Sequence, residues 1–315
     1  MKLLFRSGGL FGLALTLAFF CPVGLHQASA SPTSTGYWLG TGDGGVFAFG
    51  ASFHGSAASN TTRCPPNPPA RSMPNGSCSS MAPTPDGGGY WILNAYSGVI
   101  YPYGDAVSYG QPADTAAYGG GADLWPNSIG IVATPDGRGY WVLEEGLSGL
   151  GSVQPFGDAA FYGDEITIAH ATGHGGTPVA MAETSDGKGY WIVDSDGGVF
   201  SFGDATFFGS MGGKPLNAPV VGMATTPDGK GYWLAGPDGG VFSFGDAVFG
   251  GSMATAVLAK PVIGIAADPS GSGYWLAAAD GGVFALGGAP FLGSMGGQPL
   301  NDPVIGITAA PAMPG

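Results

Sequence analysis

The stretch GYWIVDSDGGVFSFGDATFFGS, residues 189–210, decides the fold of this chain. It places two runs of aromatic and β-branched residues on either side of an Asp-Gly turn, which is the pattern of a β-hairpin. Nearly the same letters return at 231–252 and 273–294. Gly-Tyr-Trp occurs six times, with tryptophans at Trp38, Trp91, Trp141, Trp191, Trp233 and Trp275. The last three tryptophans stand 42 residues apart, so the sequence contains six repeats built on a unit of that length.

One full unit is clearest at 219–252. A strand of small residues, PVVGMATTP, is followed by a turn, the strand GYWLAG, a second turn, the strand GVFSF and a short fourth strand, AVFGGS. Four antiparallel strands in roughly 40–45 residues is the period of a β-propeller blade. The first repeat starts at Gly-Tyr-Trp without a leading strand, whereas residues 302–311 are a leading strand without the rest of its unit. We therefore predict an all-β, six-bladed propeller with four antiparallel strands per blade, its ring closed by pairing the C-terminal strand into the first blade.

The repeat also resembles a known type of sequence. GYW followed by DGGVFSFGDA is similar to a tandem repeat of secreted actinobacterial proteins with a β-propeller-like fold, in which the repeats are sometimes attached to cell-envelope enzymes. The resemblance covers nearly the whole chain after the first 30 residues. It implies a propeller at or outside the cell envelope, and it brings no catalytic residues.

Residues 1–30 have the features of a signal peptide. Lys2 and Arg6 precede an apolar run, and small residues end at Ala30. We therefore expect 31–315 to form a single propeller domain of six repeats that is secreted, either extracellular or associated with the cell envelope. Cys64 and Cys78 lie in that part of the chain, and in an oxidising compartment we expect them to form one disulfide.

The charge of the chain excludes some partners. The 315 residues carry a formal net charge of −13, which argues against nucleic acid because phosphate contacts need lysine or arginine. No segment after the signal peptide is long and apolar enough to span a bilayer, so we expect no membrane insertion once it is cleaved. We expect a monomer whose partner is an envelope glycan or an extracellular protein.

The repeated residues are predicted to build the frame. Tyr190 and Trp191 are neighbours on a strand and point to opposite faces, so both rings can be buried between blades. We expect the phenylalanines at Phe200, Phe202, Phe207 and Phe208 to pack in the same way. The alternative is a lectin in which six equivalent tryptophans stack on sugars. The repeated aspartates precede glycine in turns and are predicted to be turn residues.

Function is expected where the repeat is interrupted. The connections after the first three repeats are longer than the others, and propeller geometry predicts that they emerge on one face, where loops on a rigid scaffold can bind ligands. One of these loops carries Trp125, next to Asn127, and we predict that both contact a ligand such as a sugar. The alternative is that Trp125 anchors its own loop.

The third repeat supplies the most polar loops. Its loop 163–177 and the preceding hairpin hold four acidic residues and two histidines. Two carboxylates on facing loops can act as general acid and base on a glycosidic bond. A His-x3-His pair near carboxylates can bind zinc or another divalent ion, so we expect either such a metal or no cofactor. The candidate catalytic residues are Glu144, Glu145, Asp164 and Glu165, and the candidate metal ligands are His170 and His174.

No catalytic fingerprint accompanies these residues. The sequence has no nucleophile elbow, no P-loop and no zinc-protease motif. The leading expectation is therefore a secreted, non-enzymatic binding or scaffold propeller that recognises envelope carbohydrate or an extracellular partner through loops of blades 1–3. The alternative is a polysaccharide hydrolase or metal-dependent enzyme with its carboxylate or histidine site on the same face.

Overall fold

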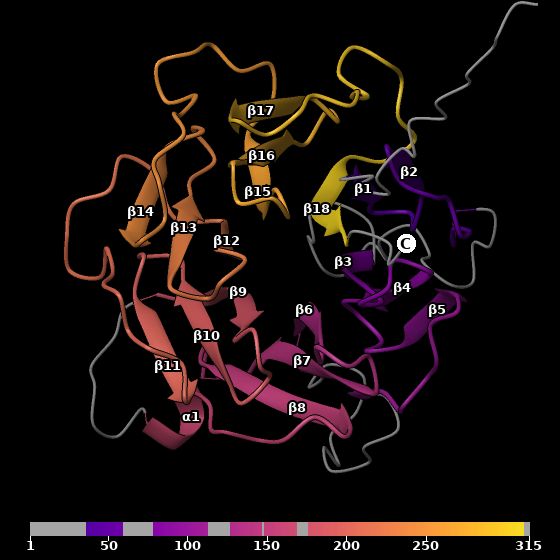
Figure 1. The fold of residues 1–315 in the computed structure, drawn as a ribbon, viewed down its shortest axis with the longest axis vertical. Helices are drawn as coiled ribbons and strands as arrows, with labels where there is room; N and C mark the ends of the chain where they lie inside the picture. The colour runs from indigo at the N-terminus through magenta and orange to yellow at the C-terminus, as the bar shows by residue number, and fades with distance from the viewer. Residues whose placement is uncertain (1–35, 59–77, 113–126, 147, 169–175, 312–315) are drawn as a thin grey trace, which may run out of the picture. The chain divides into compact units, whose positions relative to one another are not determined.

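The computed structural model describes residues 36–58, 78–112, 127–146, 148–168 and 176–311. These residues form six three-stranded antiparallel sheets, one for each Gly-Tyr-Trp repeat (Figure 1). Each sheet has a leading, a middle and a third strand, and we number the sheets one to six in chain order of the middle strand. All described residues belong to one compact unit, Pro32–Gly315.

The leading strands of sheets one to six are β18 (Val304–Ala310), β3 (Cys78–Pro83), β6 (Asn127–Ala133), β9 (Pro178–Glu183), β12 (Gly222–Thr225) and β15 (Val262–Ala267). The middle strands are β1 (Gly36–Thr41), β4 (Gly89–Asn94), β7 (Gly139–Glu145), β10 (Gly189–Asp194), β13 (Gly231–Ala235) and β16 (Gly273–Ala278). The third strands are β2 (Val46–Phe49), β5 (Ile100–Gly104), β8 (Gly151–Gly157), β11 (Val199–Gly203), β14 (Val241–Gly245) and β17 (Val283–Gly287). A short helix, α1 (Glu165–Ile168), follows the third sheet.

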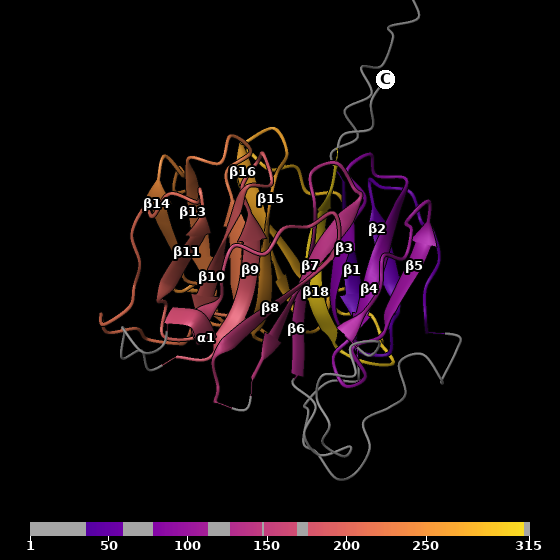
Figure 2. The same cartoon turned by 90° about the horizontal axis from the view of Figure 1, so that it is seen from below.

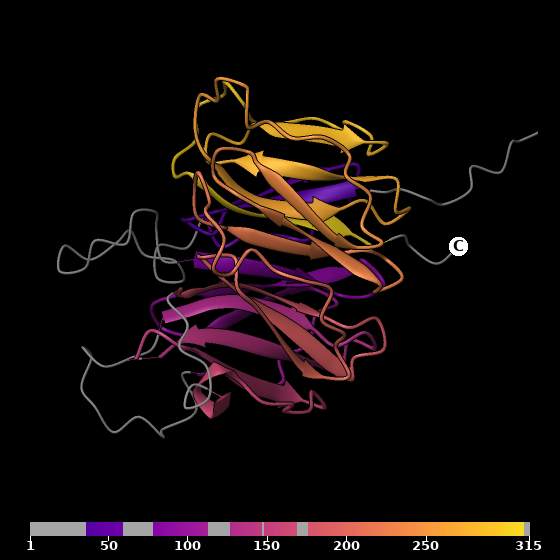
Figure 3. The ribbon, with the colours of Figure 1, turned by 90° about the vertical axis from the view of Figure 1, so that its left-hand side faces the viewer.

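The last strand of the chain completes the first sheet, as the sequence predicts. β18 pairs antiparallel with β1, with Tyr37 opposite Ala309 and Trp38 opposite Thr308. Figure 3 shows the yellow C-terminal strand beside the indigo strands of the first sheet. The chain thus joins its two ends in one sheet because the first repeat has no leading strand of its own.

The hydrophobic core lies between successive sheets. In each interface the tryptophan of one middle strand packs on the tyrosine of the next, as in Trp191 and Tyr232, whose ring centroids are 5.8 Å apart. All six tryptophans and all six tyrosines of the repeat are at most 1% exposed. The predicted core role of these aromatic residues is therefore confirmed. Stacking of the repeated tryptophans on sugars is excluded because their rings do not reach the surface.

Each sheet has three strands where four were predicted. The fourth stretch of each repeat, which we call the outer segment, follows the third strand but forms no ladder with it. The outer segments are residues 51–55, 105–110, 158–163, 204–209, 246–251 and 288–293. Their backbone is held by side chains instead: the Trp191 indole donates to the Thr206 carbonyl at 2.9 Å, and the Tyr232 hydroxyl of the next sheet donates to the Gly209 carbonyl at 2.6 Å. Equivalent pairs of bonds occur in all six repeats.

The outer segments also correct the expected packing of one phenylalanine. Phe202 is buried, but Phe207 in the outer segment is 55% exposed. The same position holds an exposed phenylalanine in five of the six outer segments, namely Phe53, Phe161, Phe207, Phe249 and Phe291. The neighbouring glycine explains this outcome: Gly209 has a φ of 126°, and its carbonyl is turned toward the Tyr232 hydroxyl. The chain bends away there and leaves the ring of Phe207 outside the interface.

The predicted turn role of the aspartates is observed. In the hairpin between β10 and β11, the Asp196 carboxylate accepts a hydrogen bond from the Gly198 amide at 2.8 Å, while Gly197 adopts a φ of 79°. That left-handed conformation favours glycine. No helix in the described ranges is long and apolar enough to cross a membrane.

Candidate functional site

The predicted catalytic carboxyl groups lie at one end of the third and fourth sheets. We call the end of each sheet at which its middle and third strands are joined the hairpin end. The strands that follow the longer connections start there: the Cys78 amide donates to the Gly42 carbonyl of the first hairpin, and the Ser128 amide to the Ala95 carbonyl of the second, both at 3.1 Å. In Figure 2, α1 and the start of β6 lie toward the same edge of the sheets. The described residues thus agree with the prediction that connections and hairpins share one face.

Glu144 is a buried residue of the middle strand β7. Its side chain is 1% exposed, and it accepts hydrogen bonds from the Ser128 hydroxyl at 3.3 Å and from the Gln154 amide. Burial raises the pKa of Glu144 to about 7, because the charged form loses its water while only neutral donors face it. Glu144 is therefore partly protonated near neutral pH, but it has little access to a bulky substrate.

Asp164 caps the helix α1. One oxygen of its carboxylate accepts the Thr167 amide at 2.9 Å, and the Thr167 hydroxyl donates to the Asp164 carbonyl at 2.6 Å. This is the arrangement of an N-terminal cap, in which a side chain satisfies an amide that the first helical turn leaves free. This structural role as a helix cap explains why an aspartate occurs at position 164, so the residue type by itself does not support the predicted catalytic role.

Glu165 is fully buried beside a second carboxyl group. Its side chain accepts the Gly151 amide at 2.6 Å and lies within hydrogen-bonding reach of Asp194, at the end of β10. Burial, with a smaller contribution from the neighbouring Asp194 and Asp164, raises the pKa of Glu165 to about 8, although the hydrogen bond from Gly151 opposes the shift. Glu165 is therefore mostly protonated near neutral pH, because a carboxylate beside another carboxyl group in a buried site is disfavoured. We call Asp164, Glu165 and Asp194 the carboxyl cluster.

The structure therefore brings two of the four predicted carboxyl groups together and gives the other two different partners. Glu165 and Asp164 join Asp194, which sequence reasoning missed although it occupies the position of Glu144 in the next repeat. Glu144 has its own partners, and half-buried Glu145 is held by the ladder opposite Asn127 and Gly151. Within the described part of the chain, no three histidine, cysteine, aspartate or glutamate side chains are arranged to hold a metal ion.

Several predicted residues lie outside the described residues. These are Trp125, His170, His174 and Cys64. Their predicted roles in ligand binding, metal binding and the disulfide with Cys78 stay predictions. Cys78 itself is buried at the start of β3. Asn127 begins β6, where its backbone pairs with Glu145.

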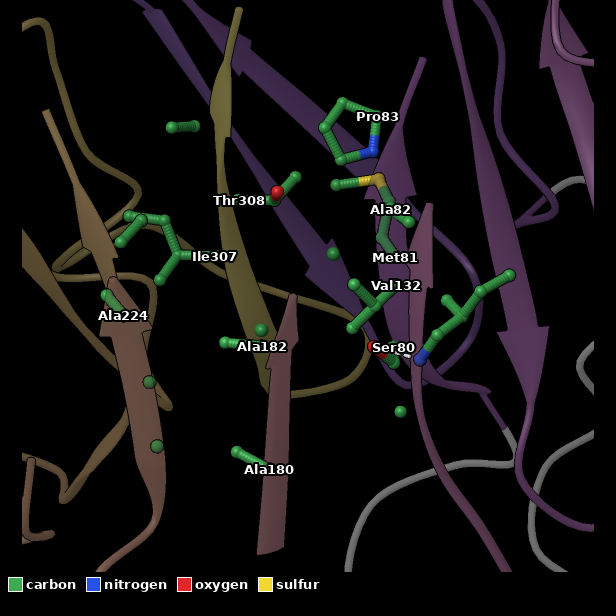
Figure 4. Close-up of a pocket in the computed structure, with 18 of the residues that line it drawn as sticks. Ser80, Met81, Ala82, Pro83, Val132, Ala180, Ala182, Ala224, Ile307 and Thr308 are labelled. Atoms are coloured by element: carbon green, nitrogen blue, oxygen red, sulfur yellow. Dashed lines mark hydrogen bonds between the residues drawn. The ribbon is translucent and has the colours of Figure 1, made fainter. Parts of the chain in front are cut away.

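A cavity that sequence reasoning missed lies among the leading strands. It has a volume of about 450 Å³ and is lined by residues of β3, β6, β9, β12, β15 and β18, one strand from every sheet. Figure 4 shows the small side chains that face it, including Ala180, Ala182 and Ala224. Glu183, at the end of β9, is the single charged residue among the described residues that line it. The available signal was the recurrence of alanine, glycine and aliphatic residues, without aromatic residues, in every leading strand.

Comparison with known proteins assigns no family to the chain: no protein-family model matches it, and neither does any curated protein.

Proposed function

We propose that the chain is a secreted, non-enzymatic propeller that binds cell-envelope carbohydrate or an extracellular protein partner through the longer connections of its first three repeats. The proposal has three parts, namely a closed frame, a specialised sector of that frame and a ligand outside the cell. The signal-peptide features of residues 1–30 and the resemblance of the repeat support export, and contacts within the sheets support the frame and its sector.

A closed ring of six sheets is supported by the links between the last and first repeats. The Tyr37 hydroxyl donates to the Gly293 carbonyl at 2.6 Å, in the same way that Tyr232 bonds Gly209 between sheets four and five. The rings of Tyr37 and Trp275 pack with centroids 5.0 Å apart. Each leading strand also contacts the leading strands of two other sheets, and β18 contacts both β15 and β3. The sixth interface therefore has the same construction as the other five.

The specialised sector is supported by one position of the repeat, and this observation carries the proposal. Five residues after the first glycine of each middle strand, sheets one to four hold buried polar residues, whereas sheets five and six hold small ones. In order these residues are Thr41, Asn94, Glu144, Asp194, Gly236 and Ala278. Burying a polar group lowers stability unless it is hydrogen-bonded, so a frame alone favours the small residues. The polar ones occur in the four sheets that flank the three longer connections.

The same polar residues organise the loops above them. The Asn94 side chain accepts the amides of Tyr96 and Ser97 at 3.0 and 2.9 Å. The Thr41 hydroxyl donates to Asp43 in the first hairpin. A rigid, hydrogen-bonded support under adjacent loops is the arrangement by which scaffolds present binding residues. We infer that the ligand contacts this sector of the hairpin end.

A glycan array and a pull-down from a cell-envelope fraction test the proposal. The expected result is retention of a glycan or an envelope protein that Trp125→Ala weakens at least tenfold. The matched control is Val257→Ala in the plain connection between repeats five and six, where the side chain is fully exposed. Loss of binding in both variants, or no binding by the unaltered protein, contradicts the proposal.

The hydrolase alternative has one specific observation in its favour. Near neutral pH Glu165 is mostly and Glu144 partly protonated, and the protonated form is the state of a general acid in a glycosidase. The burial of both side chains argues against it, because a general acid must reach the glycosidic oxygen. Release of reducing ends from envelope polysaccharide that disappears in Glu144→Gln or Glu165→Gln, with glycan retention unchanged, would favour the hydrolase.

A further inference from the structure

The cavity among the leading strands is lined mostly by apolar residues, together with five serine or threonine residues and one acidic residue. Its volume of about 450 Å³ lies within the range of small-molecule sites, which are mostly apolar with a few polar groups that orient the ligand. Valine, isoleucine, methionine, alanine and glycine make up most of its lining, and no aromatic residue lines it. The side chains of Met81, Val132 and Ile307 point toward its interior from three different sheets (Figure 4).

Glu183 breaks the equivalence of the six leading strands. The residue opposite the tyrosine of each Gly-Tyr-Trp is fixed by the strand register, and in the fourth sheet Tyr190 faces Glu183. In the other five sheets the residue at this position is uncharged: Ala309, Pro83, Ala133, Thr225 and Ala267. Five of six strands thus build the frame without an acid here, so the frame does not require one.

Within the part of the chain that the structure describes, the Glu183 carboxyl group accepts a hydrogen bond from its own backbone amide and has no cationic partner. No side chain donates a hydrogen bond to it there, and the ion pairs of the structure, such as Lys188 with Asp186, lie elsewhere. Burial raises the pKa of Glu183 to about 7, so its negative form is held in a poorly solvated place without a compensating charge.

We propose that this cavity binds a small aliphatic primary amine as its ammonium ion, with the ammonium group paired to Glu183 and the hydrocarbon body against the apolar lining. An ammonium ion supplies both the missing positive charge and hydrogen-bond donors for the carboxylate. The site lies on the leading strands, so the inference is independent of the ligand proposed for the hairpin end.

The lining argues against other classes of ligand. A calcium ion takes six to eight oxygen ligands, and Glu183 is the single carboxylate here. Quaternary ammonium ions are recognised by aromatic cages, which the lining does not provide. An anion would be repelled by Glu183. An aliphatic monoamine remains the class of ligand that can both pair with the charge of Glu183 and pack against the apolar lining.

Entry of the ligand is compatible with where Glu183 lies. It is the last residue of β9, at the end of the strand opposite the hairpin end, and it is half-buried rather than sealed. Pro83 and Thr225 end their leading strands at the same level. An amine can therefore reach the carboxylate from that opening and extend its chain inward along the alanines of β9 and β12.

Isothermal titration calorimetry with n-hexylammonium tests the proposal, with 1-hexanol and hexanoate as uncharged and anionic probes of the same length. The expected result is one hexylammonium per protein, and affinity at least tenfold lower for 1-hexanol and for hexanoate. Glu183→Gln keeps the size and polarity of the side chain but removes the charge. It should weaken hexylammonium at least tenfold and leave 1-hexanol unchanged.

A second variant guards against a loss of binding through misfolding. Ala133 occupies the equivalent position on β6, which contacts β9. The double variant Glu183→Gln with Ala133→Glu returns one carboxylate to the cavity and should recover most of the hexylammonium affinity. The proposal is overturned if hexylammonium does not bind, if 1-hexanol binds equally well, or if Glu183→Gln binds hexylammonium as tightly as the unaltered protein.

Discussion

Removing one hydroxyl group tests whether the six sheets close on themselves in solution. Tyr37→Phe deletes the donor to the Gly293 carbonyl, a bond between residues 256 positions apart in the chain. The matched variant is Tyr232→Phe, which deletes the equivalent bond to Gly209 over 23 positions. Both bonds are 2.6 Å long and both tyrosines are fully buried. The local chemistry of the two changes is therefore the same.

The magnitude follows from the groups that each variant leaves without a partner. Tyr37 donates to the Gly293 carbonyl and accepts the Leu292 amide, while Tyr232 does the same with Gly209 and Phe208. Leaving a buried carbonyl unsatisfied reduces the free energy of unfolding by about 1–3 kcal/mol. The ring itself stays in place, so no large cavity adds to that loss. We expect about 2 kcal/mol for each variant if the sixth interface is as well formed as the others.

Urea unfolding followed by fluorescence of the buried tryptophans measures this loss. For a chain of this size the slope with denaturant exceeds that of small domains, so 2 kcal/mol corresponds to a shift of the midpoint by roughly 0.5 M. A closed frame predicts equal shifts for Tyr37→Phe and Tyr232→Phe. If Tyr232→Phe shifts the midpoint and Tyr37→Phe leaves it unchanged, the contact between the last and first sheets is absent in solution and the closed ring is refuted.

Three further predictions concern burial. Burial raises the pKa of Glu144 to about 7 and that of Glu165 to about 8 in the folded protein, against 4.5 for an exposed glutamate. Because the folded state binds these protons more tightly than the unfolded state, the free energy of unfolding should fall as pH rises from about 5 to 8. Urea titrations across that range check this prediction, and a flat profile contradicts it. Phe207→Ala should reduce the free energy of unfolding by less than about 1 kcal/mol because the Phe207 ring is 55% exposed. Phe202→Ala should reduce it by about 3–5 kcal/mol because the Phe202 ring is buried. Equal losses for the two variants in thermal or urea unfolding would contradict this difference in exposure. Burial raises the pKa of Tyr90 and of Tyr190 to about 12, so an ultraviolet titration should show late ionisation of these phenols and a loss of stability as pH climbs above about 10; ionisation of all tyrosines near pH 10 with the fold intact would be the contrary result.

The sheets could be predicted from the sequence because their signals are local. The alternation in GYW and GVF, together with the Asp-Gly turns, specifies the middle and third strands and the register between them. The missing leading strand of the first repeat likewise required the pairing of β18 with β1. The prediction of a fourth strand was wrong for a non-local reason. A run such as AVFGGS alternates like a strand, but its carbonyl groups are used by Trp233 and by Tyr274 of the next sheet, a contact that no short window of sequence contains.

The candidate site was harder to predict for the same reason. The spacing of Asp164 and Glu165 in a polar loop gives no sign that one caps a helix and the other enters the interior beside Asp194. Residue type indicated that these groups can ionise, but burial and partners decide whether they do. Glu183 was missed because a single acid at the end of a strand reads as a solvent-facing residue until six strands are seen to surround one cavity.

A repeat protein offers its own internal comparison, and departures from the repeat are therefore its most informative residues. Six copies of each position experience nearly the same frame, so a residue that suits the frame should suit all six. The residue five positions after the first glycine of the middle strand is small in sheets five and six, which shows that the frame tolerates Gly236 and Ala278 where Glu144 and Asp194 occur. A buried carboxyl group at such a position reduces stability without improving the packing. By that reasoning Glu144 and Asp194 are retained for something other than folding, and the same comparison at its own leading-strand position applies to half-buried Glu183. The variants Glu144→Gln and Glu183→Gln should each leave the protein at least as stable at pH 8.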